Sequence, residues 1–129
     1  MSERKQDADR AKTVLIVDDA PGIRLMLKSY LEPEGYDILM ADNAETALRL
    51  CKEQHIDLIV LDIMLPGNMM GSDVFMRLRK KNSTSHIPII TMSALPAYAD
   101  GLQTIDPHVT FLPKPFAKEQ FMQILHSLM

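Results

Sequence analysis

Four consecutive apolar residues, Leu58 to Leu61, run directly into a carboxylate at Asp62. A short unbroken apolar run of this kind is typical of a strand that is buried on both faces, as in a parallel sheet. Pro66 and Gly67 follow closely, and both residue types break regular structure. Because open α/β sheets bind their ligands beyond the carboxyl ends of their strands, Asp62 lies where a functional residue is expected.

Four further apolar segments repeat this pattern, and amphipathic segments separate them. The expected strands are residues 13–17, 36–41, 58–61, 87–92 and 109–112. Helices are expected from Pro21, after Asn43, around Val74 to Leu78, over 95–106 and over 118–128. This alternation predicts an α/β fold of the flavodoxin-like, doubly wound kind, a five-stranded parallel sheet with five flanking helices.

The composition is that of an ordinary soluble domain, and it disfavours several classes of function. The chain has 129 residues, a formal net charge of −3 and a single cysteine, Cys51. This charge offers no general attraction to nucleic acid, and no apolar run is long enough to span a membrane. No signal peptide begins the chain, so a cytoplasmic location is expected. Residues 1–11 are polar and lack periodicity, which predicts a disordered tail before one domain over residues 12–129.

Polar residues follow the ends of four of the expected strands. Asp18 and Asp19 follow the first strand, Asp62 the third, Ser93 the fourth and Lys114 the fifth. Clustered carboxylates repel one another, and Mg²⁺, which prefers oxygen ligands, relieves that repulsion. A lysine and a hydroxyl opposite the metal would complete a pocket for a phosphoryl group on Asp62. Taken singly, each residue has an ordinary alternative as a helix cap, a turn residue or a solvated charge.

Together these motifs resemble the receiver domain of bacterial response regulators. The resemblance covers about residues 12–129, and no single motif carries it alone. The matching segments are VLIVDD at 14–19, LDIMLPG at 61–67, IITMSA at 89–94 and KPF at 114–116.

The resemblance implies a role for each residue of the motifs. Asp62 accepts a phosphoryl group from a histidine kinase or a histidine phosphotransfer protein. Asp19, Asp62 and the backbone carbonyl of Met64 bind Mg²⁺, with Asp18 helping through water. Ser93 and Lys114 contact the phosphoryl oxygens, and Ser93 acts in the switch with Phe111, the aromatic residue three positions before the lysine. The Lys114–Pro115 bond is expected to be cis.

The sequence departs from the family pattern in two places. The loop from Pro66 to Gly71 is one residue longer than usual, and Met69 and Met70 occupy the position where the family often has an acidic or small polar residue. The segment 95–107 is a weak helix, because Gly101 interrupts it, although this region and the fifth strand form the usual signalling face. We expect phosphorylation to reshape that segment, a weakly helical element suited to a two-state change. The output partner is not inferred from those of relatives.

Three other functions compete with this interpretation. A docking module that keeps the receiver fold but is not phosphorylated would tolerate the unusual loop. An aspartyl-nucleophile phosphohydrolase would need a second acid two residues after the nucleophile, and Met64 cannot serve as one. A nucleotide-binding relative of flavodoxin is disfavoured because the chain has no glycine-rich phosphate loop.

The expected role is regulatory rather than enzymatic. Met64 and Leu95 flank the path of a water that would attack an aspartyl phosphate, and both are bulky and apolar. Neither can orient a water by a hydrogen bond, which predicts slow self-dephosphorylation. The chain is either a stand-alone receiver that signals through a downstream output protein or a receiver from a longer regulator, with no direct contact to nucleic acid or membrane.

Overall fold

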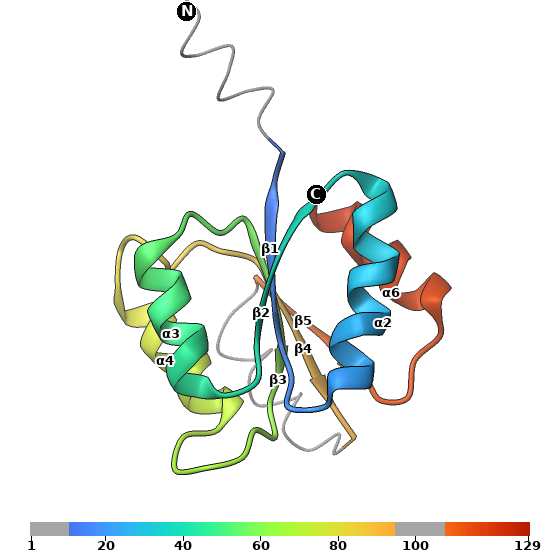
Figure 1. Ribbon diagram of the computed structural model, residues 1–129. Helices are drawn as coiled ribbons and strands as arrows, with labels where there is room; N and C mark the ends of the chain where they lie inside the picture. Colours follow the sequence, from blue (N-terminus) through green and yellow to red (C-terminus); the bar gives the residue numbers. More distant parts are fainter. Residues whose placement is uncertain (1–10, 95–107) are drawn as a thin grey trace, which may run out of the picture.

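A single parallel sheet with helices on both faces forms the body of the molecule (Figure 1). The computed structural model describes residues 11–94 and 108–129. The strands are β1 (Thr13–Val17), β2 (Asp37–Ala41), β3 (Leu58–Asp62), β4 (Ile89–Ser93) and β5 (Val109–Pro113). They pair in the order β2-β1-β3-β4-β5, and every pairing is parallel. This is the strand order of the flavodoxin-like fold that the sequence predicts.

Four α-helices cover the sheet within the described residues. They are α2 (Pro21–Leu31), α3 (Ala44–Glu53), α4 (Gly71–Lys80) and α6 (Lys118–Leu128), with a short 3₁₀ helix, η1 (Glu32–Glu34), after α2. Helices α3 and α4 lie on one face of the sheet, and α2 and α6 lie on the other (Figure 1). The fifth expected helix, over 95–106, and most of the expected tail fall outside the described residues.

The alternation of side chains along each strand builds two separate cores. Leu15 and Val17 of β1 pack with β3 side chains beneath α3 and α4. Val14 and Ile16 pack on the opposite face beneath α2 and α6. All five residues of β3 are buried, which explains why its sequence is continuously apolar rather than alternating.

Element boundaries differ from the sequence expectation at a few residues. Tyr36 lies outside β2, and β4 begins at Ile89 rather than at Ile87. Ser93 lies within β4 rather than beyond it, because β5 extends the ladder to a pairing between Ser93 and Pro113. Helix α2 is followed directly by η1, so the turn at Gly35 comes later than a simple helix end at Pro33.

None of the helices in the described parts of the chain is long and apolar enough to cross a membrane. The carboxyl ends of the central strands meet at the lower edge of the sheet in Figure 1. Backbone hydrogen bonds hold this edge in register: Ile63 N donates to Met92 O at 3.0 Å, and Lys114 N donates to Ser93 O at 2.9 Å. The residues after β3 and β5 are therefore fixed relative to β4.

Candidate functional site

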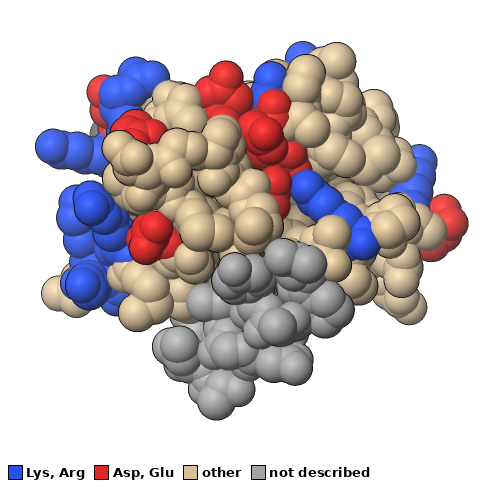
Figure 2. Space-filling model, turned by 90° about the horizontal axis from the view of Figure 1, so that it is seen from below, with Lys and Arg blue, Asp and Glu red and all other residues tan. Residues whose placement is uncertain are grey.

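Three carboxylates converge where β1 and β3 end. Asp18, Asp19 and Asp62 each place an oxygen so that the three atoms lie within 4.8 Å of one another. Asp18 and Asp62 are buried, whereas Asp19 is exposed. Figure 2 views this edge of the sheet and shows acidic side chains gathered near its centre with a basic side chain beside them. The sequence prediction that these carboxylates meet is therefore correct.

Three other residues hold Asp18 in place, two through its buried carboxylate and one through its backbone. Its Oδ1 accepts a hydrogen bond from Ala20 N at 2.9 Å, and its Oδ2 lies 2.7 Å from Lys114 Nζ. A guanidinium nitrogen of Arg24 donates to the backbone carbonyl of Asp18 at 2.7 Å. Ala20, not Asp18 or Asp19, is the N-cap residue of α2 and gives it no side-chain cap, so the helix-cap alternative does not account for either aspartate.

Asp62 is almost as enclosed as Asp18. Its Oδ1 accepts a hydrogen bond from Met64 N at 3.0 Å, so the chain turns back over the carboxylate directly after β3. Burial raises the pKa of Asp62, and the charge of Asp18 adds to this, while the hydrogen bond from Met64 and the charge of Lys114 act in the opposite direction. The protein therefore compensates a negative charge on Asp62 only in part.

Lys114 supplies the positive charge that keeps this cluster together. Its Nζ lies 2.7 Å from Asp18 Oδ2 and 3.3 Å from Asp62 Oδ2. Burial alone would lower the pKa of Lys114, but its hydrogen bond to Asp18 and the charges of both aspartates raise the pKa overall. Lys114 is thus not a solvated charge but the counter-ion of two buried carboxylates. The Lys114–Pro115 bond is cis, as predicted.

Gly71, at the start of α4, packs directly on the backbone of the site. A Cβ atom there would overlap the carbonyl oxygen of Asp62 and lie 2.7 Å from Ile63 Cα. Gly71 N donates to Ile63 O at 2.8 Å. In the sequence, Gly71 stands out only as the end of a lengthened loop. The requirement for glycine comes from this close approach of a helix to β3, which no local pattern reveals.

The longer loop is anchored rather than displaced. Met69 is partly buried against the core beneath α3 and α4. Met70 precedes α4, and its N–H donates to Asp73 Oδ2 at 2.9 Å. Because the loop is closed at this end and Gly71 contacts β3, the extra residue leaves the carboxylates of the site together.

Arg24 makes a further contact that the sequence did not reveal, since nothing in its local pattern separates it from an ordinary helix-surface arginine.

The predicted switch residues flank the cluster on neighbouring strands. Ser93 is 1% exposed at the end of β4. Phe111 lies in β5, paired with Thr91, and is half-buried. Leu95 and the segment 95–107, where a response to phosphorylation is expected, lie outside the described residues.

A shallow hollow of ≈ 370 Å³ lies beside Lys114. Apolar side chains dominate it, and Lys114 is its one charged member among the described residues. The hollow is lined by Ile23, Met26, Ala94, Lys114, Pro115 and Phe116. It gives the charged site an apolar border on the α2 side.

The residues at this edge fit a hard divalent cation. Three carboxylate oxygens within 4.8 Å of one another match the oxygen ligands that Mg²⁺ takes, with water completing its shell. Asp19 and Asp62 bring carboxylates from two different strands, and the turn at Met64 brings backbone polar groups to the same place. Lys114, which neutralises the cluster, follows the edge strand β5 and does not cover Asp19, which stays exposed.

Comparison with known proteins gives one consistent family. The model of the response regulator receiver domain matches residues 14–126. The phosphate regulon transcriptional regulatory protein PhoB of Pseudomonas aeruginosa is 34% identical over 119 residues, which span 92% of this chain and 52% of that protein. The DNA-binding dual master transcriptional regulator RpaA of Synechocystis is 34% identical over 117 residues, 90% of this chain and 48% of that protein. The chain thus spans about half the length of the relatives it matches.

Solved structures show the same fold. The response regulator TrrA of Thermotoga maritima, solved in complex with Mg²⁺-BeF, has a TM-score of 0.80 and 34% identity, covering 92% of this chain and 99% of that one. The chemotaxis protein CheY4 of Vibrio cholerae has a TM-score of 0.83 at 24% identity, covering 93% of this chain and 100% of that one. At 24% identity, the similarity to CheY4 shows a shared fold alone.

Proposed function

This chain belongs to the response regulator receiver domain family of two-component systems, and we propose that Asp62 is its phosphoacceptor. The observation that carries the proposal is the contact of Asp62 with Lys114, 3.3 Å away, inside a cluster with Asp18 and Asp19. A carboxylate at the end of a buried strand, with a lysine and two further acids around it, is arranged for attack on a phosphoryl group.

The reaction we propose is transfer from a phosphohistidine donor. A carboxylate oxygen of Asp62 forms the new bond to phosphorus, the phosphorus–nitrogen bond to the donor histidine breaks, and the electron pair stays on the imidazole nitrogen. The ammonium group of Lys114 neutralises charge on the phosphoryl oxygens. Burial disfavours the charge on Asp62, and Lys114, 3.3 Å away, lies where it would also neutralise charge on an attached phosphoryl group.

Mg²⁺ is the cofactor that we propose for this site. Asp19, Asp62 and the backbone carbonyl of Met64 would hold it, and Asp18 would contribute through water. When bound, the ion would neutralise charge on the transferring group. The exposure of Asp19 supports this role, since a ligand residue at the mouth of the cluster can meet an incoming hydrated ion.

Ser93 and Phe111 are the proposed switch. The hydroxyl group of Ser93, enclosed at the end of β4, would contact a phosphoryl oxygen on Asp62. Phe111, half-buried on the neighbouring strand β5, would turn inward as Ser93 moves. We propose that this switch changes the face of this chain that binds its partners, around β5 and the segment 95–107.

The role is regulatory, and we infer that the chain turns over its own phosphoryl group only slowly. The proposed partners are a histidine kinase or a histidine phosphotransfer protein and a downstream output protein or domain. The apolar hollow beside Lys114 supplies a dry surface on which the donor can dock while its phosphohistidine reaches Asp62. We propose that the domain acts in the cytoplasm and that it does not itself contact nucleic acid or membrane.

The test is incubation with acetyl phosphate and Mg²⁺, read by intact mass. We expect the mass of one phosphoryl group to be added to the wild type and not to Asp62→Asn. Asp42→Asn, at an exposed position outside the cluster, is the matched control and should be labelled like the wild type. Labelling that persists in Asp62→Asn would overturn the assignment. A wild type that takes no label would favour the docking module that is not phosphorylated.

A further inference from the structure

A second large concave feature lies between helices α3 and α4, at the end of the sheet opposite Asp62. This groove has a volume of ≈ 1190 Å³. Its walls come from the last turns of the two helices and from the residues that lead into β3 and β4, such as Ile56 and Ile87. About five residues of strand, or roughly 16 Å, separate this edge from the carboxylate cluster. The groove is therefore distinct from the phosphoryl site.

The rim of the groove is strongly basic. Five lysine and arginine side chains line it, against a single acidic one, Glu53, which gives a formal charge of +4 on a chain whose total is −3. The basic members are Arg49, Lys52, Arg77, Lys80 and Lys81.

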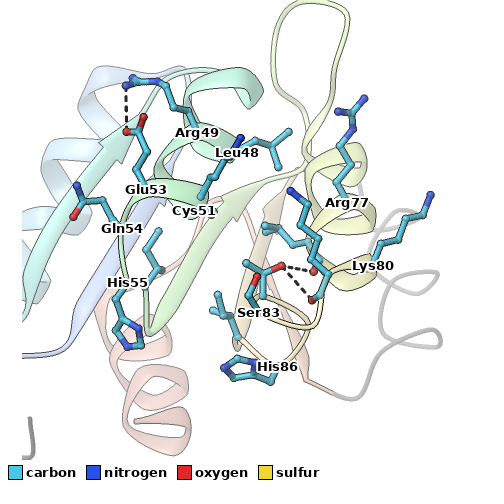
Figure 3. Close-up of a pocket in the computed structure, with 16 residues that line it drawn as sticks. Leu48, Arg49, Cys51, Glu53, Gln54, His55, Arg77, Lys80, Ser83 and His86 are labelled. Atoms are coloured by element: carbon cyan, nitrogen blue, oxygen red, sulfur yellow. Dashed lines mark hydrogen bonds and ion pairs between the residues drawn. The ribbon is translucent and has the colours of Figure 1, made fainter.

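Most of this positive charge has no counter-charge in the part of the chain that the structure describes. Arg49 pairs with Glu53 at 3.6 Å, at exposed positions on α3. For the other four basic residues of the rim, no carboxylate among the described residues lies within ion-pair distance. His55 and His86 stand at one end of the groove, one from each wall (Figure 3), and His55 lies 2.9 Å from Asp57. The basic side chains lie around the rim rather than inside the groove, and Arg77 and Lys80 extend outward from α4 (Figure 3). Their like charges repel one another, and an anionic ligand at the rim would relieve this repulsion.

The floor of the groove is apolar and closed. Ile56, Leu78 and Ile87 are each 5% exposed or less at its base. Burial raises the pKa of Cys51 to about 11, so this thiol stays protonated and packs as a small apolar group. The hydroxyl group of Thr84 is already used, since it donates to Leu78 O at 2.6 Å. The apolar surface still accessible in the groove comes from the half-buried Leu48 and Cys51 of α3 and from the stems of the basic side chains. A ligand that fits therefore combines apolar side chains for this surface with negative charges for the rim.

The local backbone argues against a small phosphate ligand. Helices α3 and α4 present their carboxyl ends to the groove, and the carbonyl groups there repel anions rather than bind them. Basic residues in the last turn of a helix complement its dipole, which explains Lys52 and Lys80 singly. It does not explain why basic side chains from two helices line one groove. Among the described residues, no Phe, Tyr or Trp side chain lines the groove, so the large aromatic platforms on which nucleobases stack are not present there.

We propose that this basic groove binds an acidic, partly apolar peptide segment of a protein partner. Carboxylates spaced along such a segment pair with long side chains from both walls, and the apolar residues between them cover the half-buried Leu48 and Cys51. Because the groove and Asp62 lie at opposite edges of the sheet, the segment binds without blocking the phosphoryl site. This surface therefore lets a partner stay bound while Asp62 is phosphorylated or while an output partner binds near it.

The test uses a fluorescein-labelled peptide in which glutamate alternates with leucine, followed by fluorescence anisotropy. The groove variant is Arg77→Glu with Lys80→Glu and Lys81→Glu. The control, with the same change in net charge outside the groove, is Lys12→Glu with Lys28→Glu and Lys118→Glu. Reversal of three rim charges should weaken binding by roughly tenfold or more, whereas the control should bind within about twofold of the wild type. Wild-type binding should weaken as salt is added.

Several outcomes would overturn the proposal. Equal loss of binding in both variants would show an effect of net charge alone, and equal retention would place the peptide elsewhere. Binding of a peptide with glutamine in place of glutamate, as tight as the acidic peptide, would exclude charge recognition. Binding of single-stranded RNA or phosphatidylserine vesicles to the groove, without binding of the acidic peptide, would point to another class of ligand. If the groove variant melts early by circular dichroism, Arg49→Gln with Lys52→Gln on the α3 wall provides the same comparison without charge reversal.

Discussion

The ammonium group of Lys114 lies 2.7 Å from Oδ2 of Asp18, a carboxylate that is completely buried. The same ammonium group lies 3.3 Å from Oδ2 of Asp62. Two carboxylates of the site thus share one counter-ion, which enters from β5 across the width of two strands. The stability of this edge of the sheet and its chemistry depend on the same lysine.

Replacing Lys114 with methionine should therefore destabilise the fold. The substitution leaves two buried carboxylates without their counter-ion, a change that costs about 2–4 kcal/mol after allowance for the 22% exposure of the lysine side chain. Thermal unfolding in metal-free buffer measures the loss. Lys28→Met is the matched control, because its ion pair with Glu32 is exposed and 4.0 Å long. Equal stability of the two variants would show that Lys114 does not neutralise the cluster.

Asp62→Asn should make the metal-free protein more stable at neutral pH. Burial raises the pKa of Asp62, so the folded state binds this proton more tightly than the unfolded chain. The stability due to this group is full at low pH and is lost as the pH rises through the raised pKa. The uncharged Asn side chain does not lose this stability, and we expect the free energy of unfolding of the variant to exceed that of the wild type by on the order of 1 kcal/mol at neutral pH.

The gain should disappear as the pH falls below 3.8, the ordinary pKa of this group, where both states of the wild type are protonated. Urea unfolding of both proteins in EDTA across this range measures the difference. A wild type that is more stable than Asp62→Asn at neutral pH would contradict the expected direction.

The sequence predicted most of the fold because short apolar segments alternate with amphipathic ones. The unbroken run from Leu58 to Leu61 indicates a strand buried on both faces, and five apolar segments in alternation with helices indicate a doubly wound sheet. The convergence of Asp18, Asp62 and Lys114 followed from that topology, since the carboxyl ends of parallel strands share one edge. These inferences needed only local pattern and the rules of sheet connection.

Other features depended on contacts between distant segments and could not be read from local pattern. The contact of Arg24 with the carbonyl of Asp18 depends on the angle at which α2 leaves β1. The extension of β4 to Ser93 depends on its pairing with Pro113. The basic groove depends on the packing of α3 beside α4, which brings together residues 49–52 and 77–81.

Gly71→Ala should be far more damaging than an ordinary glycine substitution. A methyl group there overlaps the Asp62 carbonyl, so α4 or the end of β3 must move, at a cost of about 2–3 kcal/mol. Labelling by acetyl phosphate should also slow, because the shift moves Asp62 relative to Lys114. Gly22→Ala is the matched control, since nothing lies within 4 Å of the added atom in α2. The control should gain about 0.4–1 kcal/mol.

Mg²⁺ should stabilise the wild type, and Asp19 should be needed for the effect. A ligand that binds only the folded state at ten times its dissociation constant adds about 1.4 kcal/mol. We expect the melting temperature to rise with added Mg²⁺ in the wild type and in Asp42→Asn, and to stay constant in Asp19→Asn. Asp42 is exposed like Asp19 but lies outside the cluster. A wild type indifferent to Mg²⁺ would count against a metal site.

The lifetime of the phosphorylated state should depend on Met64. This side chain is 41% exposed, and its backbone N–H donates to Asp62 Oδ1 at 3.0 Å, so it stands at the mouth of the site. A thioether does not orient water for attack on an aspartyl phosphate, whereas a carboxylate or an amide at this position does so through a hydrogen bond. We expect Met64→Glu and Met64→Asn to lose the phosphoryl group roughly tenfold faster than the wild type.

Intact mass measured over time, after removal of acetyl phosphate, gives these rates directly. Met76→Glu is the matched control, because Met76 is similarly exposed, at 44%, but lies on α4 outside the cluster. It should lose the label at the wild-type rate. If the wild type already loses its phosphoryl group as fast as Met64→Glu does, water reaches Asp62 by a path that Met64 does not control, and the lengthened loop before Gly71 is the first segment to alter.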